Sequence, residues 1–216
     1  MIIFPDISFW QDNNGTAQGI DFAQMARQTQ AVIIRAGQNR WVDEDFPLNY
    51  FAAKAAKLMR GVYWFYDSRS TPKDQANLLR TAIKDDKPEC GIWLDFEESY
   101  GGNYGSDRHM KDFAERVIGY YPNTKIGVYT GYYWWMNRVT WRTRSWWRRF
   151  PLWIAAYPRL ADLEQFKPKV PAPFSSWLFH QYTDRGEGKL FGVESSRIDL
   201  NRFNGSWDDF KAYFNS

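Results

Sequence analysis

Eight short apolar runs recur along the 216-residue chain, separated by polar, glycine-containing or helical segments. Most are too short for a helix and are bounded by Gly, Pro or polar residues, a pattern typical of buried β-strands. The pattern therefore predicts eight strands. The runs span residues 2–7, 31–36, 61–66, 91–97, 125–130, 152–157, 177–182 and 197–203.

Helical patterns lie between several of these runs. An alanine-rich stretch with helical spacing stops at Gly61, and a second pattern places Pro72 in its first turn, where proline often starts a helix. A third pattern repeats apolar residues at every fourth position from Phe113. The predicted helices span residues 46–60, 72–86 and 107–121.

The alternation of strands and helices favours a mostly parallel sheet. About eight strands in one domain of this size indicate a closed (β/α) barrel, irregular because some connections look too short for a complete helix. An open doubly wound sheet is the alternative, but no glycine-rich phosphate loop follows the first strand. We therefore expect an α/β fold, a single-domain irregular TIM-like barrel over residues 1–216.

Composition argues against nucleic-acid binding, an internal disulfide and a Cys/His metal site. The chain has 28 Lys and Arg against 25 Asp and Glu, a net charge of +3, too small to indicate nucleic acid as the main partner. The single cysteine, Cys90, cannot form an internal disulfide, and no Cys/His cluster has metal-site spacing. Aromatic residues make up 19% of the chain, and Trp and Tyr suit stacking on sugar rings as well as core packing.

Two carboxylates end the apolar run "GIWLDFEESY", residues 91–100. Side chains two apart in a strand face the same way, so Asp95 and Glu97 are expected to point together into the mouth of the barrel. Barrel enzymes gather their active sites at this end of the strands. Other predicted strands bring Asp6, Arg35 and Asp199 towards the same mouth.

This arrangement suits glycosidic cleavage. The reaction needs an acid that protonates the leaving oxygen and a second carboxylate that supports positive charge at the anomeric carbon. Carboxylates crowded in an apolar mouth raise one another's pKa, so that one stays protonated while its neighbour is ionised. An isolated D-x-E is weak evidence, because acidic residues often pair with Arg, but its placement with Asp6 and Asp199 favours catalysis.

Six motifs, taken in order across nearly the whole chain, resemble family 25 of the glycoside hydrolases, the Chalaropsis-type lysozymes. They are "DISFWQ", "GVYWFY", "WLDFEE", "PLWIAAY", "FHQY" and "IDLNRF". The resemblance implies a flattened (β/α) barrel, no metal or organic cofactor, and bacterial peptidoglycan as the partner. It also implies hydrolysis of the β-1,4 bond between N-acetylmuramic acid and N-acetylglucosamine.

The resemblance also implies roles for the acidic residues. Glu97 matches the general acid and Asp95 its partner carboxylate, while Asp6 and Asp199 match two further acidic positions. Asp95 has two roles open to it, as a nucleophile or as a group that orients the substrate's acetamido oxygen, and both routes retain the anomeric configuration. Matches to groove-lining positions are Tyr63, Tyr66, Tyr129, Trp153, Tyr157 and Gln181.

Several residues have alternative interpretations. Arg35 is either a substrate contact or an ion-pair partner for Asp6 or a neighbouring acid. Strand alternation turns His180 away from the mouth, which makes it a structural residue. Glu98 is expected to point opposite Glu97, and Cys90 to be a small buried residue.

Two segments depart from the family pattern. After "FWQ", residues 12–15 read "DNNG", so the loop above Asp6 is expected to differ. Residues 131–150 are rich in Trp and Arg, and the favoured interpretation is an amphipathic helix that packs its tryptophans on the barrel. The alternative is contact with an anionic wall polymer or lipid phosphate through residues 134–149.

The sequence therefore predicts a muramidase, most simply a phage endolysin. The first ten residues lack a basic leader and a cleavage site, so we expect no signal peptide. The enzyme would remain in the cytoplasm of the producing cell and act on the wall after release, or be secreted if the sequence is a trimmed form. No separate wall-binding domain is visible. Two rival functions are a catalytically silent glycan-binding module and a chitinase-like glycosidase, although the D-x-x-D-x-D-x-E run of the latter is absent.

Overall fold

A computed structural model describes residues 1–12, 19–84 and 86–215, so most of the departing loop at residues 12–15 lies outside the described residues. All eight predicted runs form strands, and their ends differ from the prediction by a few residues. One short strand, β3, has no counterpart in the prediction. The strands are β1 (Ile3–Ile7), β2 (Ala31–Gln38), β3 (Trp41–Val42), β4 (Met59–Phe65), β5 (Ile92–Asp95), β6 (Ile126–Gly131), β7 (Leu152–Ala155), β8 (Phe179–Glu187) and β9 (Arg197–Phe203).

The strands close into a barrel. Their order is β1-β9-β8-β7-β6-β5-β4-β2, and β1 pairs with β2 to complete the circle, while β3 adds to the outer edge of β2. Neighbours from β1 through β2, β4, β5, β6 and β7 to β8 are parallel. The last strand, β9, runs antiparallel to both β8 and β1, which confirms an irregular TIM-like barrel.

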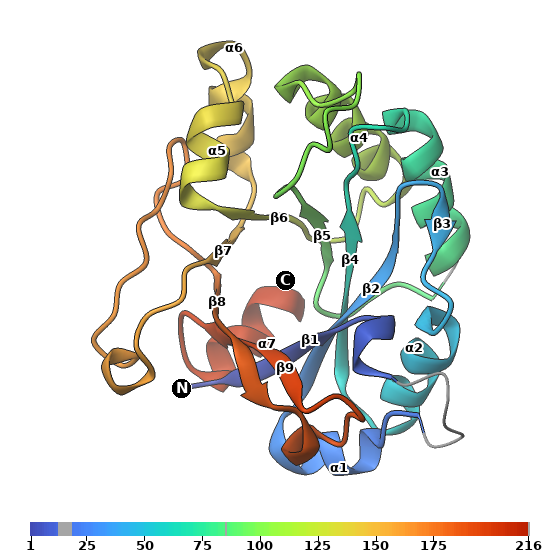
Figure 1. Cartoon of the computed structure of the whole chain (residues 1–216), viewed down its shortest axis with the longest axis vertical. Coiled ribbons are helices and arrows are strands. Elements are labelled where there is room, and N and C mark those ends of the chain that lie inside the picture. The colour runs from blue at the N-terminus through green and yellow to red at the C-terminus, as the bar shows by residue number, and fades with distance from the viewer. Residues whose placement is uncertain (13–18, 85, 216) are drawn as a thin grey trace.

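Seven α-helices among the described residues accompany the strands, most of them on the outside of the barrel (Figure 1). Thr71 caps the helix that starts at Pro72, as predicted, whereas the first predicted helix ends at Ala55, because Lys57 adopts a positive φ of 63° and β4 already begins at Met59. None of the described helices is long and apolar enough to span a bilayer. The helices are α1 (Phe22–Gln28), α2 (Phe46–Ala55), α3 (Pro72–Ile83), α4 (Asp107–Tyr120), α5 (Tyr132–Arg138), α6 (Trp141–Arg144) and α7 (Trp207–Asn215).

An aromatic column fills the barrel beneath its mouth. Phe210 of α7 stacks with Phe179 at a centroid distance of 5.9 Å, and Phe179 packs on Trp93 at 4.6 Å. Trp93 contacts Trp153, which lies 4.6 Å from Tyr129 at the mouth. Because densely packed rings resist movement, this column gives the residues above it a rigid floor.

Residues 131–150 form three short helices instead of one long helix. α5 and α6 are followed by the 3₁₀ helix η2 (Ser145–Arg149). The break between α5 and α6 is fixed by Asp107, which accepts hydrogen bonds from the Thr140 backbone N–H and from the hydroxyls of Thr140 and Thr143. The prediction of a single amphipathic helix is therefore wrong.

Candidate active site

Four carboxyl groups gather at the mouth of the barrel. Asp95 is the last residue of β5, Glu97 follows it by two positions, and Asp6 lies in β1. Asp199 reaches the same mouth because β9 is antiparallel and pairs it directly with Asp6. All four line one cavity of about 330 Å³.

Asp6 is the carboxyl group of the four that protein hydrogen bonds stabilise best. Its Oδ2 accepts hydrogen bonds from Nε2 of Gln181 at 3.0 Å and from Nδ2 of Asn201 at 2.8 Å. Burial nevertheless raises the pKa of Asp6 to about 6, and the two amide donors oppose that rise. Asp6 is therefore the carboxyl group that ionises first among those whose pKa is resolved to a value.

Further hydrogen bonds hold the amide groups of Gln181 and Asn201 in place. Oε1 of Gln181 accepts hydrogen bonds from the hydroxyls of Tyr129 and Tyr157, at 2.8 and 2.7 Å. Nε1 of Trp153 donates to Oδ1 of Asn201 at 2.7 Å. Because each amide oxygen accepts from a fixed ring, each amide nitrogen must face Asp6.

Glu97 keeps a proton near neutral pH. Burial, followed by the charge of Asp6, raises the pKa of Glu97 to about 7, and the nearby Tyr129 hydroxyl opposes the rise. Burial and the charge of Asp6 likewise raise the pKa of Asp199 to about 8. A carboxyl group with a pKa close to the working pH can both donate and recover a proton, which is the requirement for a general acid.

Asp95 is buried, with 4% of its surface exposed. Burial, then the charges of Glu97 and Asp6, raise the pKa of Asp95 well above its ordinary value, while the Arg35 guanidinium opposes the rise. Its Oδ1 atom has no hydrogen-bond partner among the described residues. A buried acceptor of this kind is costly unless a ligand supplies a donor.

The cleft continues on the other side of Glu97. A second cavity of about 290 Å³ shares Glu97 and Tyr129 with the first and extends to Trp134 and Tyr157. Glu97 therefore lies where two hollows meet. A chain of sugars that occupies both hollows would place a glycosidic oxygen beside its carboxyl group.

Comparison with known proteins identifies the family. The model of the glycosyl hydrolases family 25 matches residues 5–189. The chain belongs to glycosyl hydrolase family 25. Lysozyme M1 of Streptomyces globisporus is 28% identical over 212 residues, which is 93% of this chain and 67% of that protein.

Solved structures of family-25 enzymes and related endolysins share the fold. A bacterial lysozyme from Streptomyces coelicolor is 25% identical, with a TM-score of 0.76 over 99% of this chain and 97% of that one. The catalytic domain of the endolysin ply40 from bacteriophage P40 of Listeria monocytogenes is 22% identical, with a TM-score of 0.71 over 100% and 98%. This family-25 enzyme is accordingly a glycoside hydrolase, a lysozyme that acts on peptidoglycan.

Most groove residues predicted for the family-25 enzyme line its cleft, and Tyr66 does not. Its ring packs on Phe96 and Phe113, and its hydroxyl donates to the Tyr104 carbonyl. Tyr66 follows Tyr63 by three positions, so strand alternation turns it to the outer face of the barrel. The predicted residues in the first cavity are Arg35, Tyr63, Tyr129, Trp153 and Gln181, and Tyr157 lies in the second.

Arg35 pairs with Asp43 and not with Asp6. Its Nε donates to Oδ2 of Asp43 at 2.8 Å, and its guanidinium lies 4.7 Å from the Phe9 ring and 5.0 Å from the Trp41 ring. Its Nη2 atom has no hydrogen-bond partner among the described residues. The hairpin of β2 and β3 brings Asp43 back to Arg35, a contact that the apolar pattern does not reveal.

Several residues that line the cleft were not predicted from the sequence. Trp10 and Tyr100, 68% and 48% exposed, line the first cavity, and Trp134 lines the second. Tyr100 adopts a positive φ of 45° and lies under the Arg69 guanidinium at 4.4 Å. Trp10 belongs to the motif "DISFWQ" and Trp134 to the segment 131–150, but their aromatic character was the only signal for a place in the cleft. Asn201, which holds Asp6, stood within "IDLNRF" without being singled out.

The structural interpretations of His180, Glu98 and Cys90 are confirmed. His180 is buried; its Nε2 donates to the Ala156 carbonyl and its Nδ1 accepts from Arg202, which fixes a neutral ring. Burial lowers the pKa of His180 to about 4. Glu98 is exposed, and Cys90 is buried with its thiol pKa raised.

Proposed function

We propose that this lysozyme cleaves the β-1,4 bond between N-acetylmuramic acid and N-acetylglucosamine, with Glu97 as the general acid. The observation that supports this role is the position of Glu97 at the junction of the two cavities, combined with a pKa of about 7. Its proton passes to the glycosidic oxygen as the bond to the anomeric carbon breaks.

Asp95 supports the anomeric centre. In the substrate-assisted route, the acetamido oxygen forms a bond to the anomeric carbon while the acetamido N–H donates to a carboxylate. The partnerless Oδ1 of Asp95 suits that donor and favours this route over direct attack by Asp95. Water then opens the ring intermediate, Glu97 takes the proton from the water, and the configuration is retained.

Asp6 and Asp199 shape the electric field around this pair. The negative charge of Asp6 is the largest Coulombic contribution to the raised pKa of both Glu97 and Asp199. An ionised Asp6 therefore helps Glu97 to remain protonated before the reaction. Gln181 and Asn201 keep the Asp6 carboxylate in place through their hydrogen bonds.

The deciding experiment is a digest of purified peptidoglycan by the native protein, by Glu97→Gln and by the matched control Glu98→Gln. New reducing ends are reduced with borohydride and identified by mass spectrometry. We expect reduced muramic acid ends, about a thousandfold slower release with Glu97→Gln, and almost no change with the exposed neighbour.

Reduced glucosamine ends would show that the other glycosidic bond is cut. No release of ends by the native protein would favour the silent glycan-binding module. Equal losses in the two variants would contradict the role of Glu97.

We further propose that the enzyme is an endolysin that accumulates in the cytoplasm of the producing cell. The shared fold of the bacteriophage P40 endolysin domain supports this setting. Expression in a host with susceptible peptidoglycan should leave the cells intact until chloroform opens the membrane, after which turbidity should fall. Lysis without chloroform, or enzyme found in the medium of intact cells, would contradict the proposal.

A further inference from the structure

The strongest concentration of positive charge in the molecule lies outside the cleft. Residues 131–150 contain five of the 28 basic residues and none of the 25 acidic ones, which leaves 23 basic against 25 acidic residues elsewhere. The excess charge of the chain therefore resides entirely in this segment. We call residues 134–149 the arginine ridge.

The inner face of the arginine ridge is structural. Trp135 and Trp147 are fully buried and pack edge to face at 5.3 Å, and Nε1 of Trp135 donates to the Ala172 carbonyl. Trp147 also packs on Phe96, which lies next to Glu97 in the chain. These contacts make the arginine ridge a rigid part of the barrel wall.

The outer face carries guanidinium groups that are held in place but not neutralised. Arg138 lies over Trp134 at 6.0 Å, Arg142 over Trp141 at 5.0 Å and Arg149 over Trp146 at 4.8 Å. No arginine of the ridge has a salt bridge to a described carboxylate. Stacking on a ring orients a guanidinium without cancelling its charge.

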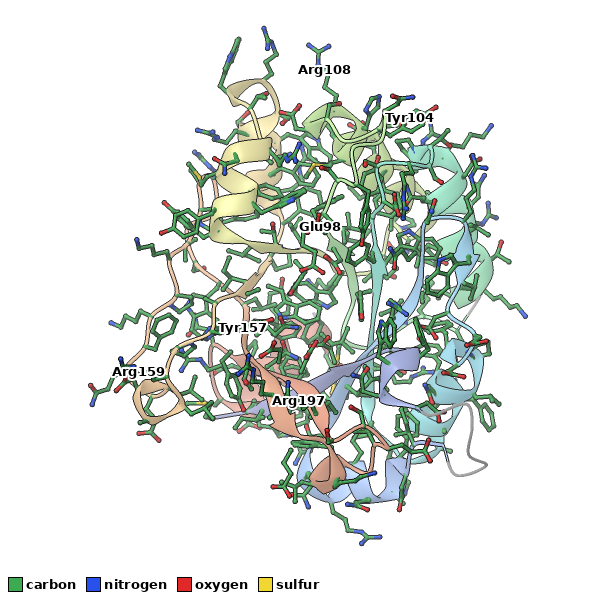
Figure 2. The ribbon with its side chains drawn as sticks, viewed as in Figure 1. Glu98, Tyr104, Arg108, Tyr157, Arg159 and Arg197 are labelled. Atoms are coloured by element: carbon green, nitrogen blue, oxygen red, sulfur yellow. The ribbon has the colours of Figure 1, made fainter. Side chains whose placement is uncertain are left out.

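The arginine ridge is continuous with the cleft. Trp134 lines the second cavity together with Glu97, and Arg138 donates to the Ser99 hydroxyl just after the two carboxylates. At its far end α6 contacts α4, where Arg108 points away from the molecule (Figure 2). A polymer attached to the glycan in the cleft would therefore pass along this face.

We infer that the arginine ridge binds a polyanion of phosphodiester groups joined to the peptidoglycan, such as wall teichoic acid. Guanidinium groups match phosphate in charge and geometry. A lipid surface fits less well, because Trp141 is the only largely exposed aromatic residue among residues 134–149, all of which the structure describes. Tyr133 lies just before them, and the ridge is divided into short helices that expose no continuous apolar face. The inference concerns binding, and it does not depend on the bond that the enzyme cleaves.

The test uses Glu97→Gln throughout, so that walls are not digested during the measurement. Into this background we introduce Arg142→Gln, Arg148→Gln and Arg149→Gln together. The matched control removes the same charge from exposed residues elsewhere, with Arg27→Gln, Lys73→Gln and Lys87→Gln. Binding is measured by sedimentation with teichoic-acid-bearing walls, with the same walls stripped by hydrofluoric acid, and with phosphatidylglycerol vesicles.

We expect the ridge variant to bind the intact walls about tenfold more weakly than the background protein, with the control unchanged. Stripping the walls should abolish the difference, and the same three substitutions in the active enzyme should leave hydrolysis of small soluble fragments unchanged. Equal binding by ridge and control variants would overturn the inference, as would stronger retention by vesicles than by walls. Matching thermal unfolding of the two variants shows that folding is not the cause.

Discussion

Ionisable groups are buried in the cleft, whereas those of the arginine ridge are mostly exposed. In the cleft, burial raises the pKa of all four carboxyl groups, to about 7 for Glu97 and about 8 for Asp199, so these two hold protons near neutral pH. On the ridge, four of the five arginine side chains, Arg138, Arg142, Arg148 and Arg149, are exposed to solvent. Burial turns a charged group into a proton donor, whereas exposure keeps it as a permanent charge that salt can screen.

Within the arginine ridge, tryptophan residues occupy both buried and exposed positions. Trp147 is fully buried on the inner face of the ridge, whereas Trp141, six residues earlier, is 76% exposed. The buried ring stabilises the wall of the barrel, and the exposed ring supports a guanidinium. The contribution of burial to stability can therefore be measured by substituting one buried and one exposed tryptophan.

The largest effect is expected for Trp147→Ala. Removal of a fully buried indole should lower the free energy of unfolding by about 3–5 kcal/mol, because it loses apolar burial and leaves a cavity. Trp141→Ala should change it by less than about 0.5 kcal/mol, since that ring is exposed. Urea denaturation of both variants measures the contrast, and similar losses would show that the outer ring is also structural.

A smaller effect, confined to pH dependence, is expected for Arg35→Met. The guanidinium opposes the raised pKa of Asp95, against the effects of burial, Glu97 and Asp6. Without it the pKa of Asp95 rises further, so the acidic limb of the kcat/KM profile should move to higher pH. The basic limb, which reflects Glu97, should stay in place.

Arg35→Lys is the control for this variant, because it retains the positive charge and should restore most of the acidic limb. A purely structural role for Arg35 would lower the rate at every pH without moving either limb. That result would contradict an influence of Arg35 on Asp95.

A displacement of both limbs of the pH profile is expected for Asp6→Asn. The Asp6 charge contributes less than burial to the raised pKa values of Glu97 and Asp95. Its removal lowers both, so both limbs of the kcat/KM profile should move to lower pH. A basic limb that does not move would show that Asp6 is not ionised beside Glu97, and high salt should change the result little because the groups are buried.

Local pattern in the sequence determined most of the fold and part of the site. Each of the eight barrel strands overlaps one of the apolar runs, and the two-residue period places Asp95 and Glu97 at one mouth. The same period also turns Tyr66 outward, a consequence that the family resemblance obscured. These features were predictable because they depend on neighbours along the chain.

Tertiary structure alone decided the remaining features. The pairing of Arg35 with Asp43, the hydrogen bonds of Asn201 to Asp6, and the division of residues 131–150 by Asp107 all join residues that no local period relates. The same holds for the raised pKa of Glu97, which follows from burial and from Asp6, about 90 residues away in the chain. Burial and Coulomb energies depend on distances in space, and only the closed barrel sets those distances.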